Sequence, residues 1–512
     1  MKKNQFKKAI KRCAVLVAGF AIAFSTPMVA SADAGYTYCY DYWGEVKESP
    51  DSYEVVGQFS AAELGIEKVF KHEKGSLRFL NKPSSLTVVG DSVFITDSGN
   101  NRILEFKHPD AETFEFVRCI DGFKGADNNT FNYPTDFQMD AEGNMYIADY
   151  NNDRIVKIDP QMNFLLEFTK PDDATLGANS SFKPKKIVVD SAGRVYCVAF
   201  GINKGLVKYE ADASFSGFVG ATPVSYNFTD YMWKRFATQA QRERSVSFVP
   251  TEYDNLYMDH EGFIYVVSAF IKEEDLKANK MDSIRKLNLM GSDILIRNGD
   301  FPVYGDLYMG TGGGKTGPSR MMDITSFPNK VYMGLDGNRG RIFAYDNQGH
   351  LLYAFGGIGN IAGYFSKPVS IEHKDYEILV LDETGYVTTF VPTEYGELIY
   401  RAIDEFDEGL YAKSGDTWQE VMNINGNYDL AYIGVGRSLL RQERYKEAMK
   451  YFELKYNDDN YSKAFKQYRK EWVEENIFVI FLVLLVIIAV PLLIGRIKMI
   501  KHEIDTADIF RF

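Results

Sequence analysis

Residues 133–158 read YPTDFQMDAEGNMYIADYNNDRIVKI, and this stretch decides the fold. Pro134 opens a short apolar strand, a turn at 140–143 follows, and a second strand leads to a third that begins at Arg154. Proline is tolerated where a strand begins, before ladder pairing starts, and glycine supplies the positive φ of a short hairpin. NFLLEF, from Asn163, adds a fourth strand. Four successive antiparallel strands form one blade of a β-propeller.

The same pattern opens six segments of the chain. Their prolines are spaced 51, 50, 66, 68 and 50 residues apart: Pro83, Pro134, Pro184, Pro250, Pro318 and Pro368. Such a repeat indicates an array of like units, so we expect a mainly β, six-bladed propeller over 83–402. We leave open how 35–82 closes the ring; Tyr53 to Phe59 could add an outer strand.

Each repeat also carries an expected charge pair. An Asp ends the second strand and an Arg starts the third, as in Asp97 with Arg102 and Asp149 with Arg154. We expect these pairs to be structural, within one blade.

The composition agrees with an all-β body and argues against one class of partner. The 512 residues include 33 Tyr, 37 Phe and 42 Gly, which suits aromatic strands separated by glycine turns. The 58 basic and 70 acidic residues leave a net charge of −12. Because phosphate binding depends on cationic patches, nucleic acid is not an expected partner.

The N-terminus has the three parts of a secretory signal peptide. MKKNQFKKAIKR is basic, CAVLVAGFAIAF is apolar, and STPMVASADA ends in small residues. We therefore expect a signal peptide over 1–34, cut after Ala32 or Ala34. The remaining Cys39, Cys119 and Cys197 are an odd, scattered set, which indicates free thiols; a Cys39–Cys119 bond is geometrically possible but has no support.

An uninterrupted apolar run near the C-terminus predicts a membrane anchor. Residues 477–494 are all apolar, long enough for a transmembrane helix that we place at 477–495. Basic residues follow at once in the tail 496–512, and the positive-inside bias puts this tail in the cytoplasm. The chain is then expected to be a single-pass cell-membrane protein with an extracytoplasmic bulk.

Between the propeller and the anchor, residues 403–476 are expected to form a helical neck. YDLAYIGVGRSLLRQERYKEAMKYFEL (428–454) has large and small residues near the positions of a tetratricopeptide repeat. A lone repeat exposes the face that a neighbouring repeat would cover, so the neck could hold a partner protein. Candidate anchors for the partner are four aromatic residues: Tyr432, Tyr445, Tyr451 and Phe452. Alternatively, these side chains dock the neck onto the propeller.

The repeats resemble the NHL repeat, a six-bladed propeller family, most clearly in GNNRILEF (99–106) and NNDRIVKI (151–158). With the signal peptide, the helices containing YSKAFKQYR (461–469) and the C-terminal span, the whole chain resembles a group of Gram-positive bacterial membrane proteins labelled gluconolactonase-like. This resemblance implies a binding or scaffold module accessory to a carbohydrate-type ABC transport system. The alternative that it implies is a propeller hydrolase or lyase that depends on Ca²⁺ or Zn²⁺.

Candidate ligand-binding residues come from the inner strands. Counting two residues past each opening proline, with Asn255 as the equivalent in the fourth repeat, gives Ser85, Asp136, Lys186, Asn255, Arg320 and Ser370. Such a mixed-charge ring favours a polar small molecule or glycan, because Lys186 and Arg320 would repel a divalent cation. We therefore expect no metal and no cofactor, and catalysis is the less favoured reading. The alternative is that these residues are solvated strand ends.

Three other features complete the interpretation. Among the histidines of the expected ectodomain only His373 lies on an expected inner strand, where a hydrogen-bonded core group is the commoner role. A helix is expected at 229–245, either as a lid or as a packed decoration. MGTGGGKTGPS (309–319) lacks the first glycine of a phosphate loop and leads into a strand, so we interpret it as a loop near the channel mouth.

Overall fold

The computed structural model describes residues 37–173, 176, 181–220, 253–268, 270–278, 280–309 and 317–509. The expected signal peptide (1–34), the helix expected at 229–245 and most of the glycine-rich loop lie outside these residues.

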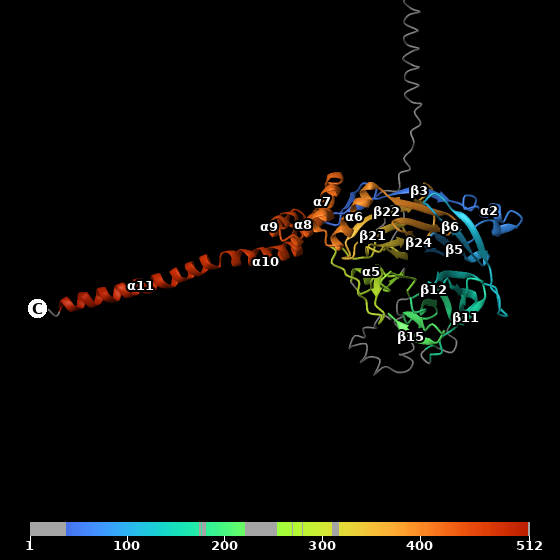
Figure 1. Cartoon of the computed structure of the whole chain (residues 1–512), viewed down its shortest axis with the longest axis horizontal. Helices are drawn as coiled ribbons and strands as arrows, with labels where there is room; N and C mark the ends of the chain where they lie inside the picture. Colours follow the sequence, from blue (N-terminus) through green and yellow to red (C-terminus); the bar gives the residue numbers. More distant parts are fainter. Residues whose placement is uncertain are drawn as a thin grey trace, which may run out of the picture.

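Antiparallel sheets succeed one another along the chain and make the body a β-propeller (Figure 1). The first sheet holds β4 (Ser85–Val89), β5 (Ser92–Asp97), β6 (Arg102–Lys107) and β7 (Glu115–Ile120). The second holds β8 (Pro134–Met139), β9 (Met145–Asp149), β10 (Arg154–Ile158) and β11 (Phe164–Phe168). The third holds β12 (Lys183–Val189), β13 (Val195–Phe200), β14 (Leu206–Tyr209) and β15 (Phe215–Val219).

The later sheets are less uniform. One has three strands, β16 (Asn255–Met258), β17 (Ile264–Val267) and β18 (Ile284–Leu287). The next holds β19 (Met321–Ser326), β20 (Tyr332–Asp336), β21 (Arg341–Tyr345) and β22 (Leu351–Ile358), extended by β1 (Tyr38–Tyr40), β2 (Val46–Glu48) and β23 (Tyr364–Phe365). The last holds β24 (Pro368–Lys374), β25 (Glu377–Asp382), β26 (Val387–Pro392) and β3 (Tyr53–Phe59). In the described residues, five sheets thus have four or more strands.

The N-terminal segment completes the last sheet. β3 pairs antiparallel with β26, in a register that sets Phe59 opposite Val387 and Tyr53 opposite Pro392. The innermost strands β4, β8, β12, β16, β19 and β24 contact one another in that order, and β24 returns to β4. The strand at 53–59 is therefore the outer strand of this sheet, a role that the sequence suggested but did not decide.

The expected Asp–Arg pairs are confirmed. Arg102 Nε lies 2.8 Å from an Asp97 carboxylate oxygen, and Arg154 Nε lies 3.0 Å from one of Asp149. The same guanidinium of Arg102 donates to the carbonyl of Leu77 at 2.9 Å. Each pair therefore fastens the connector that precedes its blade, which is a structural role.

The C-terminal region is helical and begins earlier than 403. The strands end at Pro392, and the helices are α6 (Glu394–Asp407), α7 (Tyr411–Ile424), α8 (Asp429–Arg441), α9 (Tyr445–Leu454) and α10 (Asp458–Glu475). Short helices also occur before and within the propeller: α2 (Ile66–Val69), α5 (Glu273–Lys277) and the 3₁₀ turns η1 (Gly75–Arg78), η2 (Ser98–Asn100) and η3 (Tyr150–Asn152).

Small residues let the neck helices cross closely, as the tetratricopeptide-like pattern predicts. A Cβ on Gly434 would lie 2.6 Å from the Trp418 ring, and one on Gly436 would lie 2.6 Å from the Phe452 ring. Each glycine therefore makes room for an aromatic side chain from a neighbouring helix.

The helices and the propeller share one hydrophobic core. Tyr400 of α6 packs with Tyr53 and Tyr353 of the propeller in that core. The Tyr428 hydroxyl donates to the carbonyl of Leu352 in β22 at 2.9 Å. The neck is therefore fixed to the sheets by buried aromatic residues.

Helix α11 (Ile477–Ile509) projects from the body at the C-terminal end (Figure 1). Over Ile477–Thr506 its best window has a mean hydropathy of 3.6, and none of that window is buried against the rest of the chain. It is long and apolar enough to cross a membrane. The three described cysteines, Cys39, Cys119 and Cys197, are free thiols.

Candidate functional site

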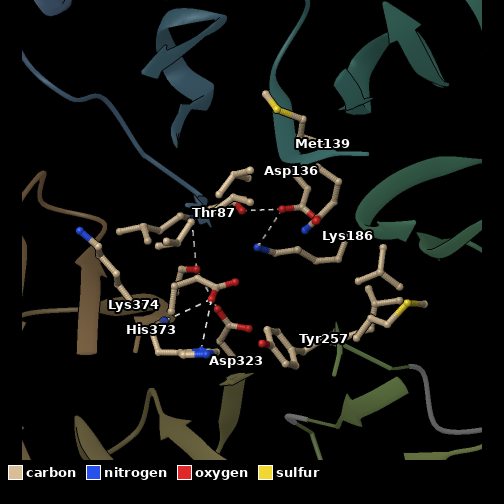
Figure 2. A pocket seen from close by; sticks show the side chains of 18 of the residues that line it. Thr87, Asp136, Met139, Lys186, Tyr257, Asp323, His373 and Lys374 are labelled. Atoms are coloured by element: carbon tan, nitrogen blue, oxygen red, sulfur yellow. Dashed lines mark hydrogen bonds and ion pairs between the residues drawn. The ribbon is translucent and has the colours of Figure 1, made fainter. Parts of the chain in front are cut away.

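A cavity of about 660 Å³ opens where the innermost strands converge on the propeller axis (Figure 2). Six of the residues singled out in the sequence line it: Ser85, Asp136, Lys186, Asn255, Ser370 and His373. They come from five strands, β4, β8, β12, β16 and β24. The repeat thus gathers residues far apart in sequence into one site.

Arg320 is the exception, and its place in the ring has to be corrected. Its guanidinium lies 4.0 Å from the centre of the Phe270 ring, and it is not among the described residues that line the cavity. Asp323 lines the cavity from β19 instead.

The register explains this error. In β8, Pro134 lies opposite Asp149, and a bulge places Asp136 next in the ladder. In β19, Met321 lies opposite Asp336, and the same bulge places Asp323 next. Met321, and not Pro318, thus holds the first position of this repeat. Counting two residues from the proline therefore reaches Arg320 instead of Asp323.

The ring residues tie neighbouring inner strands together. Asp136 accepts a hydrogen bond from the backbone N–H of Ile187 at 2.8 Å, and Asp323 accepts one from that of Ile371 at 2.9 Å. The Ser370 hydroxyl accepts one from the backbone N–H of Leu86 at 3.2 Å. Each bond joins one inner strand to the next, and the last joins β24 to β4. The ring residues therefore form hydrogen bonds between neighbouring inner strands and are not merely solvated strand ends.

Lys186 contacts two other groups at this ring of inner-strand residues. Its side chain is 9% exposed, and its ammonium lies 3.7 Å from an Asp136 oxygen. It also donates to the carbonyl of Ser84 at 3.0 Å. Asp136 in turn accepts from the Ser85 hydroxyl. The only lysine of the ring is thus already neutralised and hydrogen-bonded.

A second layer of side chains faces the cavity two residues further along the strands. Glu372 follows Ser370, Tyr257 follows Asn255 and Gln138 follows Asp136. Alternate residues of a strand point to the same side, so this spacing would have located the layer in the sequence. Glu372 and Tyr257 line the cavity, and the sequence analysis missed both.

Glu372 is the least compensated acid of the site. Burial, followed by the neighbouring carboxylate of Asp323, raises the pKa of Glu372 well above its ordinary value. Its hydrogen bond comes from the backbone N–H of His373, at 3.2 Å. A carboxyl in this setting favours its protonated form, which can donate a hydrogen bond.

His373 is held as a neutral ring. Its Nδ1 is hydrogen-bonded to Thr325 Oγ1 at 2.7 Å, and its ring lies edge-on to Phe327, with 5.0 Å between the ring centres. Burial lowers the pKa of His373 from 6.5 to about 4. A hydrogen-bonded histidine on the inner strand is the role that the sequence favoured.

Two further carboxylates that line the cavity are paired with lysines. Lys374 lies 2.9 Å from Asp91, and Asp259 lies 2.7 Å from Lys286. Within the described ranges, no group of three or more His, Cys, Asp or Glu side chains is arranged to hold a metal ion.

The four aromatic residues suggested as anchors for a partner differ in exposure. Phe452 is fully buried in the helical core. Tyr432, Tyr445 and Tyr451 are partly exposed. Lys455 lies over the Tyr432 ring at 4.3 Å. Phe452 is therefore a core residue, and only the other three can meet a partner.

No family model matches the chain, and no curated protein matches it. Solved structures similar to it include virginiamycin B lyase from Staphylococcus aureus, with 9% identity, a TM-score of 0.36, and coverage of 66% of this chain and 99% of the other. The extracellular domain of a one-component system from Bacteroides thetaiotaomicron has 13% identity and a TM-score of 0.35, over 67% of this chain and 37% of the other. A gluconolactonase from Xanthomonas campestris has 9% identity and a TM-score of 0.34, over 61% of this chain and 86% of the other.

These solved structures include an extracellular domain, a lyase and a lactonase. At such identities and TM-scores they carry no argument about activity, so the function has to be argued from the site.

Proposed function

We propose that the chain is a membrane-anchored, extracytoplasmic binding module whose propeller cavity takes a polar small molecule or a short glycan. The observation that carries this proposal is the cavity of about 660 Å³, which lies within the size range of small-molecule sites. Carboxylate, ammonium, hydroxyl and amide groups converge on it from the inner strands. Convergent polar groups in a preformed cavity fix the orientation of a ligand.

The propeller is proposed to have six blades of the NHL type, with the three-stranded sheet as the fourth. Two contacts support this count. β16 contacts β12 on one side and β19 on the other. The backbone N–H of Ile294 donates to the carbonyl of Lys286 on β18 at 2.7 Å, so an irregular segment runs where a fourth strand would lie.

The placement in the membrane is also proposed. Helix α11 would anchor the chain in the cell membrane of a Gram-positive bacterium, with the propeller outside and 496–512 in the cytoplasm. The partly exposed Tyr432, Tyr445 and Tyr451 would contact a membrane partner, for which a carbohydrate-type ABC transport system is the candidate. A single span has no room for a pore, so any role in transport would depend on such a partner.

One observation favours a second candidate, a propeller hydrolase or lyase. Glu372 and His373 share the cavity, and their pKa values are displaced in opposite directions, upward for the acid and downward for the imidazole. Pairs of titratable groups displaced in this way are typical of acid and base catalysis. Any Ca²⁺ or Zn²⁺ would belong to this alternative.

The binding function is tested on the full-length protein in detergent micelles. A panel of mono- and disaccharides is screened by the shift of the thermal unfolding midpoint, and hits are confirmed by calorimetry. Gln138→Trp, which fills the cavity from β8, should abolish binding, whereas Gln58→Trp on the exposed outer strand β3 should not. Hits that both variants bind equally, or an absence of hits, would contradict the proposal. Chelator-sensitive turnover of a lactone would favour the enzyme.

The partner proposal needs its own experiment. A photo-crosslinking residue at Tyr445 or Tyr451 is compared in native membranes with one at the buried Phe452. Recovery of a permease only from the first two sites supports the accessory role, and recovery of this chain alone overturns it.

A further inference from the structure

We infer that the ligand of the propeller cavity is an organic cation: a hydroxylated small molecule that carries one protonated amine, with an amino sugar as the simplest example. This inference rests on the proposed binding function and specifies the chemistry of the ligand.

The charges around the cavity do not balance. Asp136, Asp91 and Asp259 are each paired with a lysine, at 3.7, 2.9 and 2.7 Å. Within the described part of the chain, Asp323 and Glu372 form no ion pair with Lys or Arg. The sequence predicted that Arg320 would line the cavity, but the residue of this repeat that lines it is the acidic Asp323. The cavity therefore has an excess of acid.

The charge of Lys186 acts on both carboxyls, but their hydrogen-bond donors are all neutral. Asp323 accepts from the Ser370 hydroxyl at 2.7 Å and from the backbone N–H of Ile324 at 2.9 Å, besides that of Ile371. The nearest basic group to Glu372 is the Nδ1 of His373, at 3.9 Å. That ring is neutral, because burial lowers its pKa to about 4. A cationic ligand would supply the missing countercharge.

Lys186 is already engaged by other groups of the protein. Its ammonium is held by Asp136 and by the carbonyl of Ser84, and its side chain is almost fully buried. Figure 2 shows its ammonium reaching into the cavity, joined by a dashed line to Asp136. Its charge still acts on Asp323 and Glu372, but burial outweighs it and keeps the pKa of both carboxyls raised.

The aromatic and thioether groups that line the cavity suit an organic cation better than a metal ion. Tyr257 lines the cavity near Asp323, and Met139 and Met258 line it as well. An aromatic face attracts an ammonium group and thioethers are soft, apolar neighbours, whereas a hard divalent cation prefers several oxygen ligands. Thr87 and Gln138 add neutral polar groups suited to hydroxyls.

Proton linkage supports the same ligand. Burial and the carboxylate of Asp323 raise the pKa of Glu372, so its carboxyl holds a proton in the absence of a ligand. An ammonium group that binds there stabilises the ionised carboxylate and displaces that proton. Binding should therefore release a proton at pH values above the ordinary carboxyl pKa and below the raised pKa of Glu372.

The test uses three probes that share a pyranose ring and differ in charge: glucosamine, N-acetylglucosamine and glucuronate. Binding to the full-length protein in micelles is measured by titration calorimetry in two buffers of different ionisation enthalpy, which counts the protons released. We expect glucosamine to bind at least about tenfold more tightly than the other two, a difference of about 1.4 kcal/mol, with release of a proton. Glu372→Gln should lose that release and weaken glucosamine by about tenfold. Glu142→Gln, in an exposed turn, is the matched control and should change neither.

Equal or tighter binding of N-acetylglucosamine or glucuronate overturns the inference, as does unchanged glucosamine binding in Glu372→Gln. If Gln138→Trp blocks the neutral or anionic sugar, the proposed binding function survives that result. If none of the three probes binds, the inference fails, and the wider saccharide panel then decides separately on the binding function.

Discussion

The hydroxyl of Tyr53 lies 2.9 Å from the hydroxyl of Tyr400, although 347 residues separate them in the chain. Tyr400 is also hydrogen-bonded to the Tyr353 hydroxyl, and Tyr53 donates to the carbonyl of Tyr376 at 2.8 Å. One buried group of tyrosines thus joins the N-terminal strand, two sheets and the first helix of the neck.

Tyr400→Phe should destabilise this junction. The substitution removes the hydrogen-bond partner of the Tyr353 hydroxyl and one of the two partners of the Tyr53 hydroxyl. A buried polar group without its partner costs about 1–3 kcal/mol. We expect the thermal unfolding midpoint of the full-length protein to fall by a few degrees. Tyr386→Phe, in an exposed turn, is the matched control. An equal midpoint in both variants would show that the tyrosine group adds no stability.

Asp136→Ala should be more damaging. It leaves the buried Lys186 without its anionic partner and the backbone N–H of Ile187 without an acceptor. Breaking a buried pair on one side costs about 3–5 kcal/mol. Asp136→Asn should cost less, because the amide oxygen can still accept from Ile187. Chemical denaturation of both variants, with Glu142→Ala as control, checks this order; the reverse order would contradict it.

His373 makes the fold sensitive to acid. Its pKa falls from 6.5 to about 4 on folding, so the unfolded chain binds more protons between these values. Stability therefore rises as the pH rises from about 4 to 6.5, and about 3 kcal/mol is lost on acidification across this window. His373→Asn should remove this part of the pH dependence. Parallel pH profiles of the two proteins would argue against a buried neutral ring.

Glu372 acts in the opposite direction. Its folded pKa is raised, so the folded chain binds more protons above the ordinary value of 4.5, and stability declines as the pH rises toward the folded pKa. Glu372→Gln keeps the shape of the side chain without this cost. We expect the variant to be more stable than the wild type in mildly alkaline buffer and to lose that advantage in acid. Urea unfolding at both pH values measures the difference; a less stable variant at alkaline pH would contradict it.

Two truncations separate the anchor from the neck. A chain that ends at Asn476 lacks only α11 and the residues after it, and should fold and stay monodisperse without detergent, because the best apolar window of α11 is unburied. A chain that ends at Pro392 also lacks α6–α10 and exposes Tyr53 and Tyr353, so it should unfold at a lower temperature or aggregate. Light scattering and thermal melting decide; equal behaviour of the two would mean that the neck does not share the core.

The repeat made most of the propeller predictable, because its strands depend on local signals. Proline, turn glycine and the Asp–Arg pairs recur at fixed places, so strands such as β8 to β10 follow from the sequence directly. The pairing of β3 with β26 did not, because partners so far apart leave no periodic trace in either strand.

The cavity was predictable only in part, for two physical reasons. Ser85, Asp136, Lys186, Asn255 and Ser370 follow from their distance to the start of a strand, whereas Arg320 fails because Met321 holds the register there. Glu372 is absent from the predicted ring, although its place two residues after Ser370 puts it on the same side of the strand. Its protonation depends on burial and on Asp323, which only the folded arrangement brings near.

The pairing of Phe59 with Val387 also orders the events of biosynthesis. β3 is made early and its partner β26 is made last among the strands, just before the neck and the anchor. Until β26 arrives, the growing propeller is an open arc, and both β3 and the outer side of the last sheet offer unpaired backbone to other chains. Closure of the arc is therefore a late, single step, and a nascent chain that stalls before Val387 is the form most exposed to aggregation.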